Sequence, residues 1–174
     1  MKIFYVHHAL RNIGNPPTQN DDIKPLGIKD AKIVSKLFTE AKSKYLNIRA
    51  IYTSNYLRCL KTAEIINKKL NVPIIAEPRF NEFVGVHSAV KGKENKNGET
   101  WVECQNRIIA ALKDIVNTYN DNDAVICVTS GVNITAFISV AYGIKPSNNL
   151  PFPLVPSCSP IGFDIKKEMF NGEK

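Results

Sequence analysis

Short β-rich runs alternate with longer segments of helical periodicity along nearly the whole chain, and this alternation constrains the fold most. Strands that alternate with helices in this way are typical of a mostly parallel sheet covered by helices on both faces. Residues 124–128 are apolar at every position, as expected for a central strand buried on both faces. We therefore predict a three-layer α/β/α sandwich with a mostly parallel central sheet.

The boundaries of the predicted elements follow from two periodicities. Clusters of β-branched and aromatic residues mark strands, and apolar residues three or four positions apart mark helices. Pro73 favours an edge position for the third strand, because proline cannot donate to the hydrogen-bond ladder. The predicted strands are residues 3–6, 48–53, 72–76, 124–128 and 161–165, and the predicted helices are residues 28–45, 57–70, 100–119 and 132–142.

Length and composition indicate one compact domain spanning residues 1–174, with 44% hydrophobic and 22% charged residues. A chain of this size buries enough surface to fold without disulfides or a structural metal. The four cysteines are scattered through apolar or helical segments, which favours buried, reduced thiols. No segment reaches the roughly 18 apolar residues of a membrane span, and no signal-peptide pattern is present. We therefore expect a cytoplasmic protein without a membrane partner.

The net charge of +7 raises the question of a nucleic-acid partner. Eighteen of the 23 basic residues are lysines and five are arginines, and the lysines occur along the whole chain. Nucleic-acid-binding surfaces usually contact phosphates through clustered arginine guanidinium groups. The densest basic stretch, residues 91–96, lacks interleaved aromatic residues and is typical of a solvated loop. We do not expect nucleic-acid binding as the principal function, whereas binding of a small anion stays open.

Polar residues follow the carboxyl ends of several predicted strands. His7 and His8 follow the first strand, Arg58 lies shortly after the second, and Ser130 and Gly131 follow the central strand. In open α/β sheets, ligands bind beyond this edge. The sequence therefore predicts a polar, partly basic pocket there. Because the chain has only three histidines and no evident carboxylate cluster, we expect neither a metal nor another cofactor.

Five short motifs resemble those of the histidine phosphatase superfamily, the phosphoglycerate mutase-like proteins, in the same order along the chain. The strongest is T-S-N-Y-L-R-C-L-K-T-A at residues 53–63, which is similar to the family's S-S-P-L-x-R-A-x-Q-T-A. Residues 7–9, H-H-A, stand where the family has R-H-G, and residues 23–31 resemble its L-T-x-x-G-x-x-Q-A. Residues 80–82 and 98–100 are similar to its L-x-E and G-E-S/T segments. The resemblance implies the phosphoglycerate mutase-like version of the three-layer fold.

The resemblance also implies phosphomonoester chemistry through a phosphohistidine. His8 corresponds to the nucleophile, Arg58 to an arginine that clamps the phosphate, and Glu82 to a candidate general acid. A neutral histidine can attack phosphorus, an arginine fork neutralises phosphoryl oxygens, and a carboxylic acid can protonate the leaving alkoxide. The short chain resembles the family's phosphatases more than its mutases, which usually carry extra segments over the site. The expected partner is a small phosphorylated molecule or phosphate.

Two central positions of the family are filled differently here. His7 replaces the arginine before the nucleophile, and Ser130 replaces the second histidine. Each change removes a donor or a positive charge, and one such loss commonly costs about a hundredfold in rate. Arg11 is a candidate replacement for the missing guanidinium, and His7 is a candidate donor when protonated. Ser130 is a candidate helix N-cap, ligand donor or both, and Gly131 opens a helix, where an anion is favoured.

Two functions therefore stay open. The first is a phosphomonoester hydrolase of altered or reduced efficiency that acts through His8. The second is a catalytically impaired pseudophosphatase that binds phosphate or a phosphorylated ligand, or that serves as an interaction module. The presence of His8, Arg58 and Glu82 favours the first, and the changes at His7 and Ser130 favour the second. The sequence leaves the substrate and the oligomeric state open.

Overall fold

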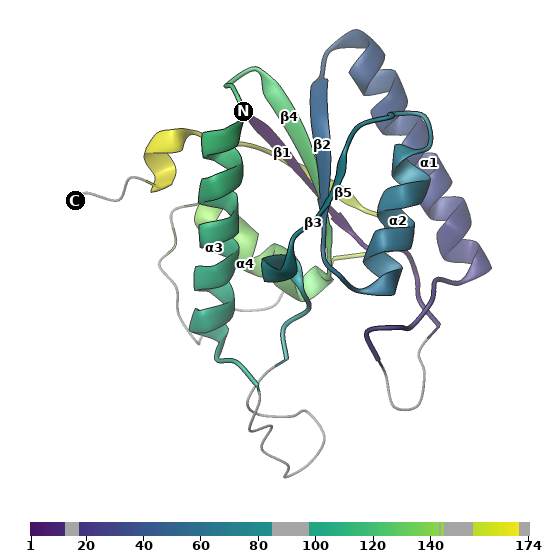
Figure 1. Cartoon of the computed structure of the whole chain (residues 1–174), viewed down its shortest axis with the longest axis horizontal. Coiled ribbons are helices and arrows are strands. Elements are labelled where there is room, and N and C mark those ends of the chain that lie inside the picture. Colours follow the sequence, from purple (N-terminus) through teal and green to yellow (C-terminus); the bar gives the residue numbers. More distant parts are fainter. Residues whose placement is uncertain (13–17, 85–97, 143, 145–154, 171–174) are drawn as a thin grey trace.

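The computed structural model is a five-stranded sheet between two helical layers (Figure 1). The structure describes residues 1–12, 18–84, 98–142, 144 and 155–170. The elements are β1 (Lys2–His7), α1 (Pro25–Lys44), β2 (Asn47–Thr53), α2 (Leu57–Asn67), β3 (Ile74–Ala76), the 3-10 turn η1 (Pro78–Phe80), α3 (Trp101–Thr118), β4 (Asp123–Thr129), α4 (Gly131–Ala141), β5 (Pro160–Asp164) and the 3-10 turn η2 (Lys167–Phe170).

The strand order is β3-β2-β4-β1-β5. The β3–β2, β2–β4 and β4–β1 pairs are parallel, and β5 runs antiparallel to β1. β3 lies at one edge of the sheet, as Pro73 predicts. The sheet is therefore mostly parallel, and its antiparallel strand, β5, is the last strand along the chain.

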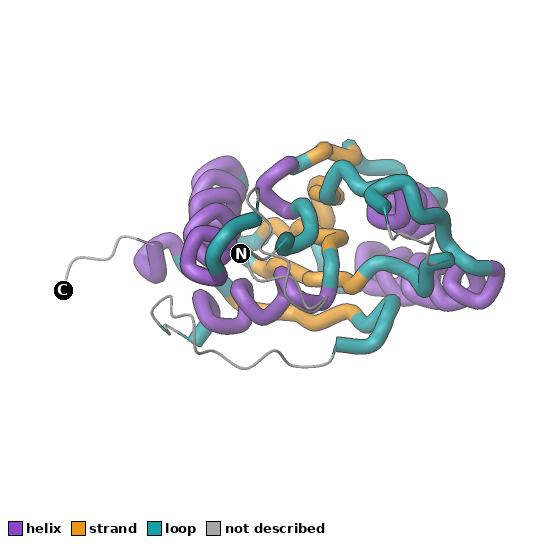
Figure 2. Tube along the Cα trace, turned by 90° about the horizontal axis from the view of Figure 1, so that it is seen from below, coloured by secondary structure: helices purple, strands orange, loops and turns teal. Residues whose placement is uncertain are grey.

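Separate apolar cores lie on the two faces of the sheet. Every residue of β4 is buried. Val125 and Cys127 belong to the core under α3 and α4, whereas Ile126 and Val128 belong to the core under α1 and α2. This alternation follows the two-residue period of a strand and explains the uninterrupted apolar run. Figure 2 shows the strands enclosed between the helices, and the predicted three-layer fold is confirmed.

All nine predicted helices and strands are present, with boundaries that differ by a few residues. α1 begins at Pro25, three residues before the predicted start, because the first turn of a helix does not need the N–H that proline lacks. α2 ends at Asn67, whose side chain exchanges two hydrogen bonds with the backbone of Val72 and so turns the chain toward β3. A capping box between Thr100 and Glu103 begins α3.

Two further observations bear on the sequence predictions. All four cysteines are buried and free, as expected. Among the described residues, no helix combines the length and the apolarity needed to cross a bilayer.

The carboxyl ends of β1, β2 and β4 lie side by side. His7 pairs with Thr129 in the β1–β4 ladder. Beyond it, the His8 amide donates to the Thr129 carbonyl at 2.9 Å, and the Ser54 amide donates to the Val128 carbonyl at 3.1 Å. The segments that follow these strands therefore converge on one edge of the sheet, as predicted.

Gly27 of α1 packs against the backbone of the segment that follows β1. A Cβ atom on Gly27 would lie 2.6 Å from the carbonyl oxygen and 2.7 Å from the amide nitrogen of Leu10. We expect Gly27→Ala to lower the free energy of unfolding by about 2 kcal/mol, although alanine is the better helix former. Urea denaturation measures this change, with Lys29→Ala at an exposed position of the same helix as the control. A Gly27→Ala protein as stable as the wild type would contradict the prediction.

Candidate active site

His8 lies at the strand-end edge with only 5% of its surface exposed. Its Nδ1 is 2.8 Å from the carbonyl oxygen of Ala9, which can only accept a hydrogen bond. Nδ1 therefore carries the ring hydrogen, and Nε2 keeps its lone pair. This is the tautomer that a nucleophile acting through Nε2 requires.

The environment of His8 also keeps its ring uncharged. The pKa of His8 is lowered to about 3, mainly by burial and then by the neighbouring His7, Arg58 and Arg11, against the opposing effect of the hydrogen bond to Ala9. The imidazole is therefore neutral near pH 7. A neutral ring whose Nε2 carries a lone pair is the form that can attack phosphorus.

Arg58, in the first turn of α2, is a buried cation with 1% of its surface exposed. Its Nε donates to His8 Nε2 at 3.2 Å, and its Nη1 donates to the Thr18 carbonyl at 3.2 Å. Its Nη2 forms an ion pair with Glu82. The guanidinium carbon also lies 4.6 Å from the centre of the Tyr56 ring, within cation–π range. Each guanidinium nitrogen thus has a partner, as a buried charge requires.

His8, Arg58 and Glu82 therefore form one continuous chain of contacts. They come from three separate segments, the turn after β1, the start of α2 and the loop after η1. The structure brings together the three residues that the sequence predicted as nucleophile, phosphate clamp and general acid. The Glu82 side chain is 26% exposed, so the carboxylate lies at the surface of the site and the imidazole at its base.

Thr62 of α2 connects the segments that carry His8 and Arg58. Its Oγ1 accepts a hydrogen bond from the Ala9 amide at 2.9 Å and donates one to the Arg58 carbonyl at 2.6 Å. The turn that carries His8 is thereby attached to the helix that carries Arg58. Thr62 lies within the motif at residues 53–63, and this position in the strongest motif was the sequence signal for its structural role.

Asn133 of α4 positions the loop that carries Glu82. Its Nδ2 lies 2.8 Å from the carbonyl oxygens of both Phe80 and Asn81 and donates to them. The side chain is fully buried. The sequence analysis missed this residue because it lies in a mostly apolar helix outside all five motifs.

His7 packs against the start of α4. Its ring centre is 4.5 Å from that of His8, and its Nδ1 lies 2.6 Å from the Val155 carbonyl oxygen. A Cβ atom on Gly131 would lie 3.1 Å from His7 Cε1, so the glycine leaves room for this ring. Burial lowers the pKa of His7. The imidazole is therefore neutral at pH 7, and the protonated donor that we predicted requires an anion beside it.

Ser130 is the unsatisfied polar group of this edge. It is 3% exposed, and its Oγ makes no hydrogen bond with any residue that the structure describes. An N-cap hydroxyl accepts a hydrogen bond from the first turn of its helix, so the capping alternative is not observed. A buried hydroxyl without a partner is destabilising, which leaves Ser130 available to a ligand. Gly131 follows it as the first residue of α4.

A pocket of about 230 Å³ opens beside Arg58 and Glu82, and Arg11 and Tyr56 also line it. Arg11 Nη1 lies 3.1 Å from Asp21 Oδ2. Arg11 thus lies on the pocket wall, where we placed it, but its charge is paired with a carboxylate. Within the described part of the chain, no cluster of three or more His, Cys, Asp or Glu residues is arranged to hold a metal ion.

Comparison with known proteins identifies the family. The model of the histidine phosphatase superfamily (branch 1) matches residues 18–90 and 85–172. The chain belongs to this superfamily. Curated proteins compared by sequence give no match.

Solved structures of the superfamily fold cover almost the whole chain. Bacillus stearothermophilus YhfR is similar with a TM-score of 0.73 and 20% identity, over 95% of this chain and 91% of that protein. The protein histidine phosphatase SixA, complexed with tungstate, has a TM-score of 0.69 and 13% identity over 97% and 91%. Mycobacterial glucosyl-3-phosphoglycerate phosphatase with VO3 has a TM-score of 0.70 and 14% identity over 92% and 90%. These likenesses confirm the phosphoglycerate mutase-like fold.

The lowered pKa of His8 predicts how stability depends on pH. The unfolded chain protonates His8 near pH 6.5, whereas the folded chain does so only at about 3. Between these values the unfolded state binds the extra proton, so stability is full above pH 6.5 and falls as the pH drops, by at most about 1.4 kcal/mol per pH unit. Guanidinium denaturation of wild type and His8→Gln at several pH values in this window measures the effect. The variant should lose less stability, and parallel curves would show that His8 is not held neutral.

Proposed function

We propose that the protein is a phosphomonoester hydrolase that acts through a phosphohistidine on His8. The observation that carries this proposal is the lone pair of His8 Nε2, which is held 3.2 Å from the Nε of Arg58. A nucleophile and a cation that binds phosphoryl oxygens are thus adjacent. The neighbouring pocket of about 230 Å³ suits a small phosphorylated molecule.

In the first step, the His8 Nε2 lone pair forms a bond to phosphorus while the ester P–O bond breaks. Arg58 transfers its hydrogen bonds from His8 and Glu82 to the phosphoryl oxygens and stabilises their charge. Glu82, released from Arg58, takes up a proton from solvent and donates it to the leaving alkoxide. The products of this step are an alcohol and phosphohistidine.

In the second step, a water molecule attacks the phosphorus of the phosphohistidine. The Glu82 carboxylate takes a proton from that water. The P–N bond breaks, its electron pair returns to His8 Nε2, and inorganic phosphate leaves. Glu82 returns this proton to solvent as it pairs again with Arg58, and the imidazole is again neutral.

Four further residues complete the proposed phosphate pocket. Ser130 Oγ is buried without a partner among the described residues, and the Gly131 amide lies at the start of α4. His7 becomes a donor when the phosphate draws a proton to it, and Arg11 reaches the phosphate by leaving Asp21. Because no guanidinium stands at position 7 and no imidazole at position 130, we expect turnover about a hundredfold or more below that of a complete site.

Properties of two relatives support the assignment. One is described as a protein histidine phosphatase and holds tungstate, and the other is a sugar-phosphoglycerate phosphatase with a vanadium oxyanion. Both anions resemble phosphate chemically, and both proteins share the fold of this chain, which supports a phosphate site here. We also propose a cytoplasmic location, because the four cysteines are free and buried, and we expect no nucleic-acid partner.

A second candidate function is that of an impaired pseudophosphatase that binds phosphate or a phosphorylated ligand. The observation that favours it is that Arg58 covers His8 Nε2 while Glu82 pairs with Arg58. His8 is therefore only 5% exposed. In such a protein a phosphate would replace Glu82 on Arg58 without reaching His8. Binding would then persist without turnover.

Replacing each histidine in turn distinguishes the two candidates. After incubation with p-nitrophenyl phosphate, wild-type protein should release nitrophenol and carry acid-labile phosphate, because phosphohistidine hydrolyses in acid. His8→Ala should lose both signals. His7→Ala is the matched control, and it should retain the acid-labile phosphate at reduced turnover, since its ring only contacts the phosphate. Equal background signals in wild type and His8→Ala would contradict the hydrolase and leave the pseudophosphatase.

Phosphate affinity tests the ion pair between Arg58 and Glu82. Glu82→Gln removes the carboxylate that occupies Arg58, so calorimetry should show phosphate binding about fivefold or more tighter while hydrolysis falls. Arg58→Ala should weaken phosphate binding by about a hundredfold. Glu99→Gln, which alters an ion pair with Arg107 outside the site, serves as the control and should change neither. Unchanged affinity in Glu82→Gln would show that the carboxylate does not compete with phosphate.

A further inference from the structure

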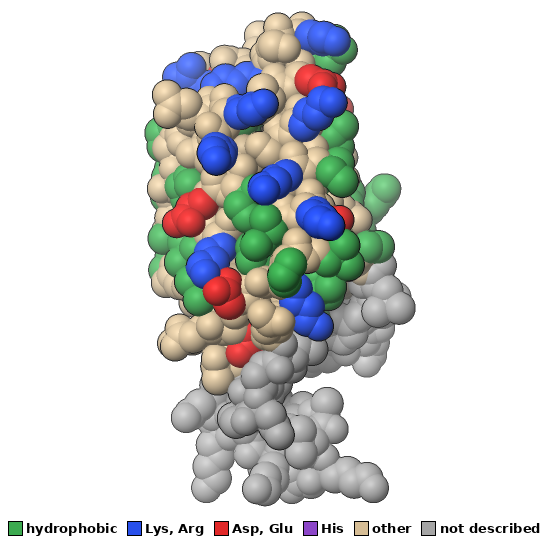
Figure 3. Space-filling view, turned by 90° about the vertical axis from the view of Figure 1, so that its right-hand side faces the viewer, with side chains coloured by type: hydrophobic (Ala, Val, Ile, Leu, Met, Phe, Trp, Pro, Cys, Tyr) green, Lys and Arg blue, Asp and Glu red, His purple; other side chains and the backbone are tan. Residues whose placement is uncertain are grey.

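Lysines occur along the whole chain, but the net positive charge of the protein is concentrated in one part of it. Residues 25–70 contain ten basic and three acidic residues, so this segment alone carries a net charge of +7, the same as the whole chain. The segment consists of α1, β2 and α2. Figure 3 shows the outer face of these two helices, where basic side chains outnumber acidic ones.

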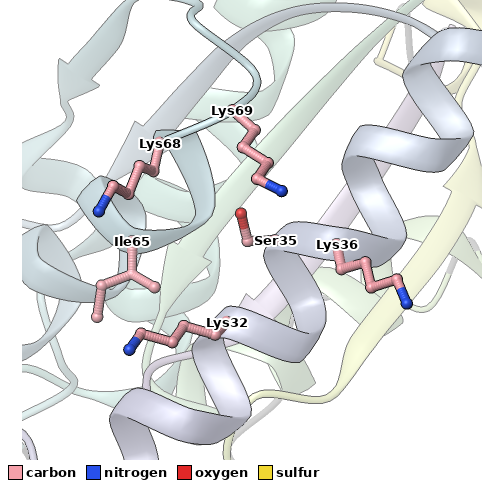
Figure 4. A pocket seen from close by; sticks show the side chains of 6 residues that line it. All are labelled: Lys32, Ser35, Lys36, Ile65, Lys68 and Lys69. Atoms are coloured by element: carbon pink, nitrogen blue, oxygen red, sulfur yellow. The ribbon is translucent and has the colours of Figure 1, made fainter.

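A groove with a volume of about 440 Å³ runs between α1 and the end of α2 on this face. Lys32 and Lys36 of α1 line it on one side, and Lys68 and Lys69, which follow α2, line it on the other. Figure 4 shows Lys69 extending from the end of α2 toward α1. Lys68 lies ten residues beyond Arg58, about 15 Å along the helix axis, so the groove is separate from the candidate active site.

The floor of the groove is apolar. Ile65 lines it, together with the aliphatic stems of the lysines. The hydroxyl of Ser35 also lines the groove, but it donates to the Ile66 carbonyl at 3.0 Å and is already satisfied. A ligand that enters the groove therefore meets apolar carbon at the base and ammonium groups around the rim.

The rim has a positive charge that its surroundings do not neutralise. No acidic side chain lines the groove. Lys36 approaches Glu40 at 3.9 Å, and both are exposed. Lys32, Lys68 and Lys69 take part in none of the ion pairs between described residues. Like charges held together repel one another, and an anion in the groove relieves that repulsion.

We propose that this groove docks an acidic segment of a partner protein, with carboxylates on the lysine rim and an apolar side chain on the floor near Ile65. Charge complementarity selects the acidic segment, and the apolar floor selects a segment that also carries a Leu-like anchor. A rim of lysines without arginine suits dispersed carboxylates better than phosphates, which favour the arginine fork. The concave shape fits a protruding side chain and not the plane of a lipid surface.

Fluorescence anisotropy with a labelled synthetic peptide tests the proposal. The probe is a poly-glutamate peptide with a central pair of leucines. Binding to the wild-type protein should weaken about tenfold in the Lys32→Gln/Lys68→Gln/Lys69→Gln variant, since three exposed ion pairs are lost. The matched control is Lys113→Gln/Lys166→Gln/Lys167→Gln, which removes the same charge from exposed positions elsewhere and should change affinity less than twofold. Replacing the two leucines of the probe by serine should also weaken binding.

Each contrary outcome overturns the proposal. Equal loss in both triple variants would show a general effect of net charge, and no loss in the groove variant would place the peptide elsewhere. If the serine probe binds as tightly as the leucine probe, the apolar floor near Ile65 does not hold a leucine anchor. Phosphatidylserine vesicles and a nucleoside triphosphate are tested in parallel, and binding of either one, lost in the groove variant while the peptide does not bind, would assign the groove to lipid or to a small phosphate ligand. Thermal unfolding of each variant checks that it is folded.

Discussion

A single buried cation organises the end of the sheet where the proposed chemistry occurs. Arg58 has 1% of its surface exposed, and a charge in that position is stable only when its donors are satisfied. Its partners come from three other segments, the turn that carries His8, the backbone at Thr18 and the loop that carries Glu82. The requirement to satisfy one guanidinium thus fixes the relative positions of His8, Arg58 and Glu82.

The fold was predictable from the sequence because its determinants are local. The apolar run of β4 and the helical spacing of α1 and α3 each report on a single element, and the ends that differed were set by specific side chains such as Pro25 and Asn67. The three central site residues were predictable for a different reason, since they lie within motifs. The resemblance to histidine phosphatases indicated their roles, and the parallel pairing of the strands indicated that they lie close together.

The remaining features of the site depend on contacts between distant segments, which periodicity does not encode. Asn133 is one polar residue in an apolar helix, and only the fold reveals that it reaches the carbonyl groups before Glu82. The ring of His7 fits because Gly131 lacks a side chain, a relation between residues 124 positions apart. Likewise, the lysines of α1 and those that follow α2 are unremarkable in sequence, and only packing of the two helices forms a groove between them.

The ion pair between Glu82 and Arg58 determines how much negative charge an anion needs to bind at Arg58. Because both groups belong to one chain, the effective concentration of the carboxylate at the guanidinium far exceeds that of a free anion in solution. Chloride, acetate or bicarbonate brings no more charge than Glu82 already supplies, so such monoanions do not replace it at ordinary concentrations. A phosphoryl dianion brings a second charge and more acceptor oxygens, and it can displace the tethered carboxylate. If the proposed phosphate pocket is correct, the resting site thereby selects anions by charge before they contact His8.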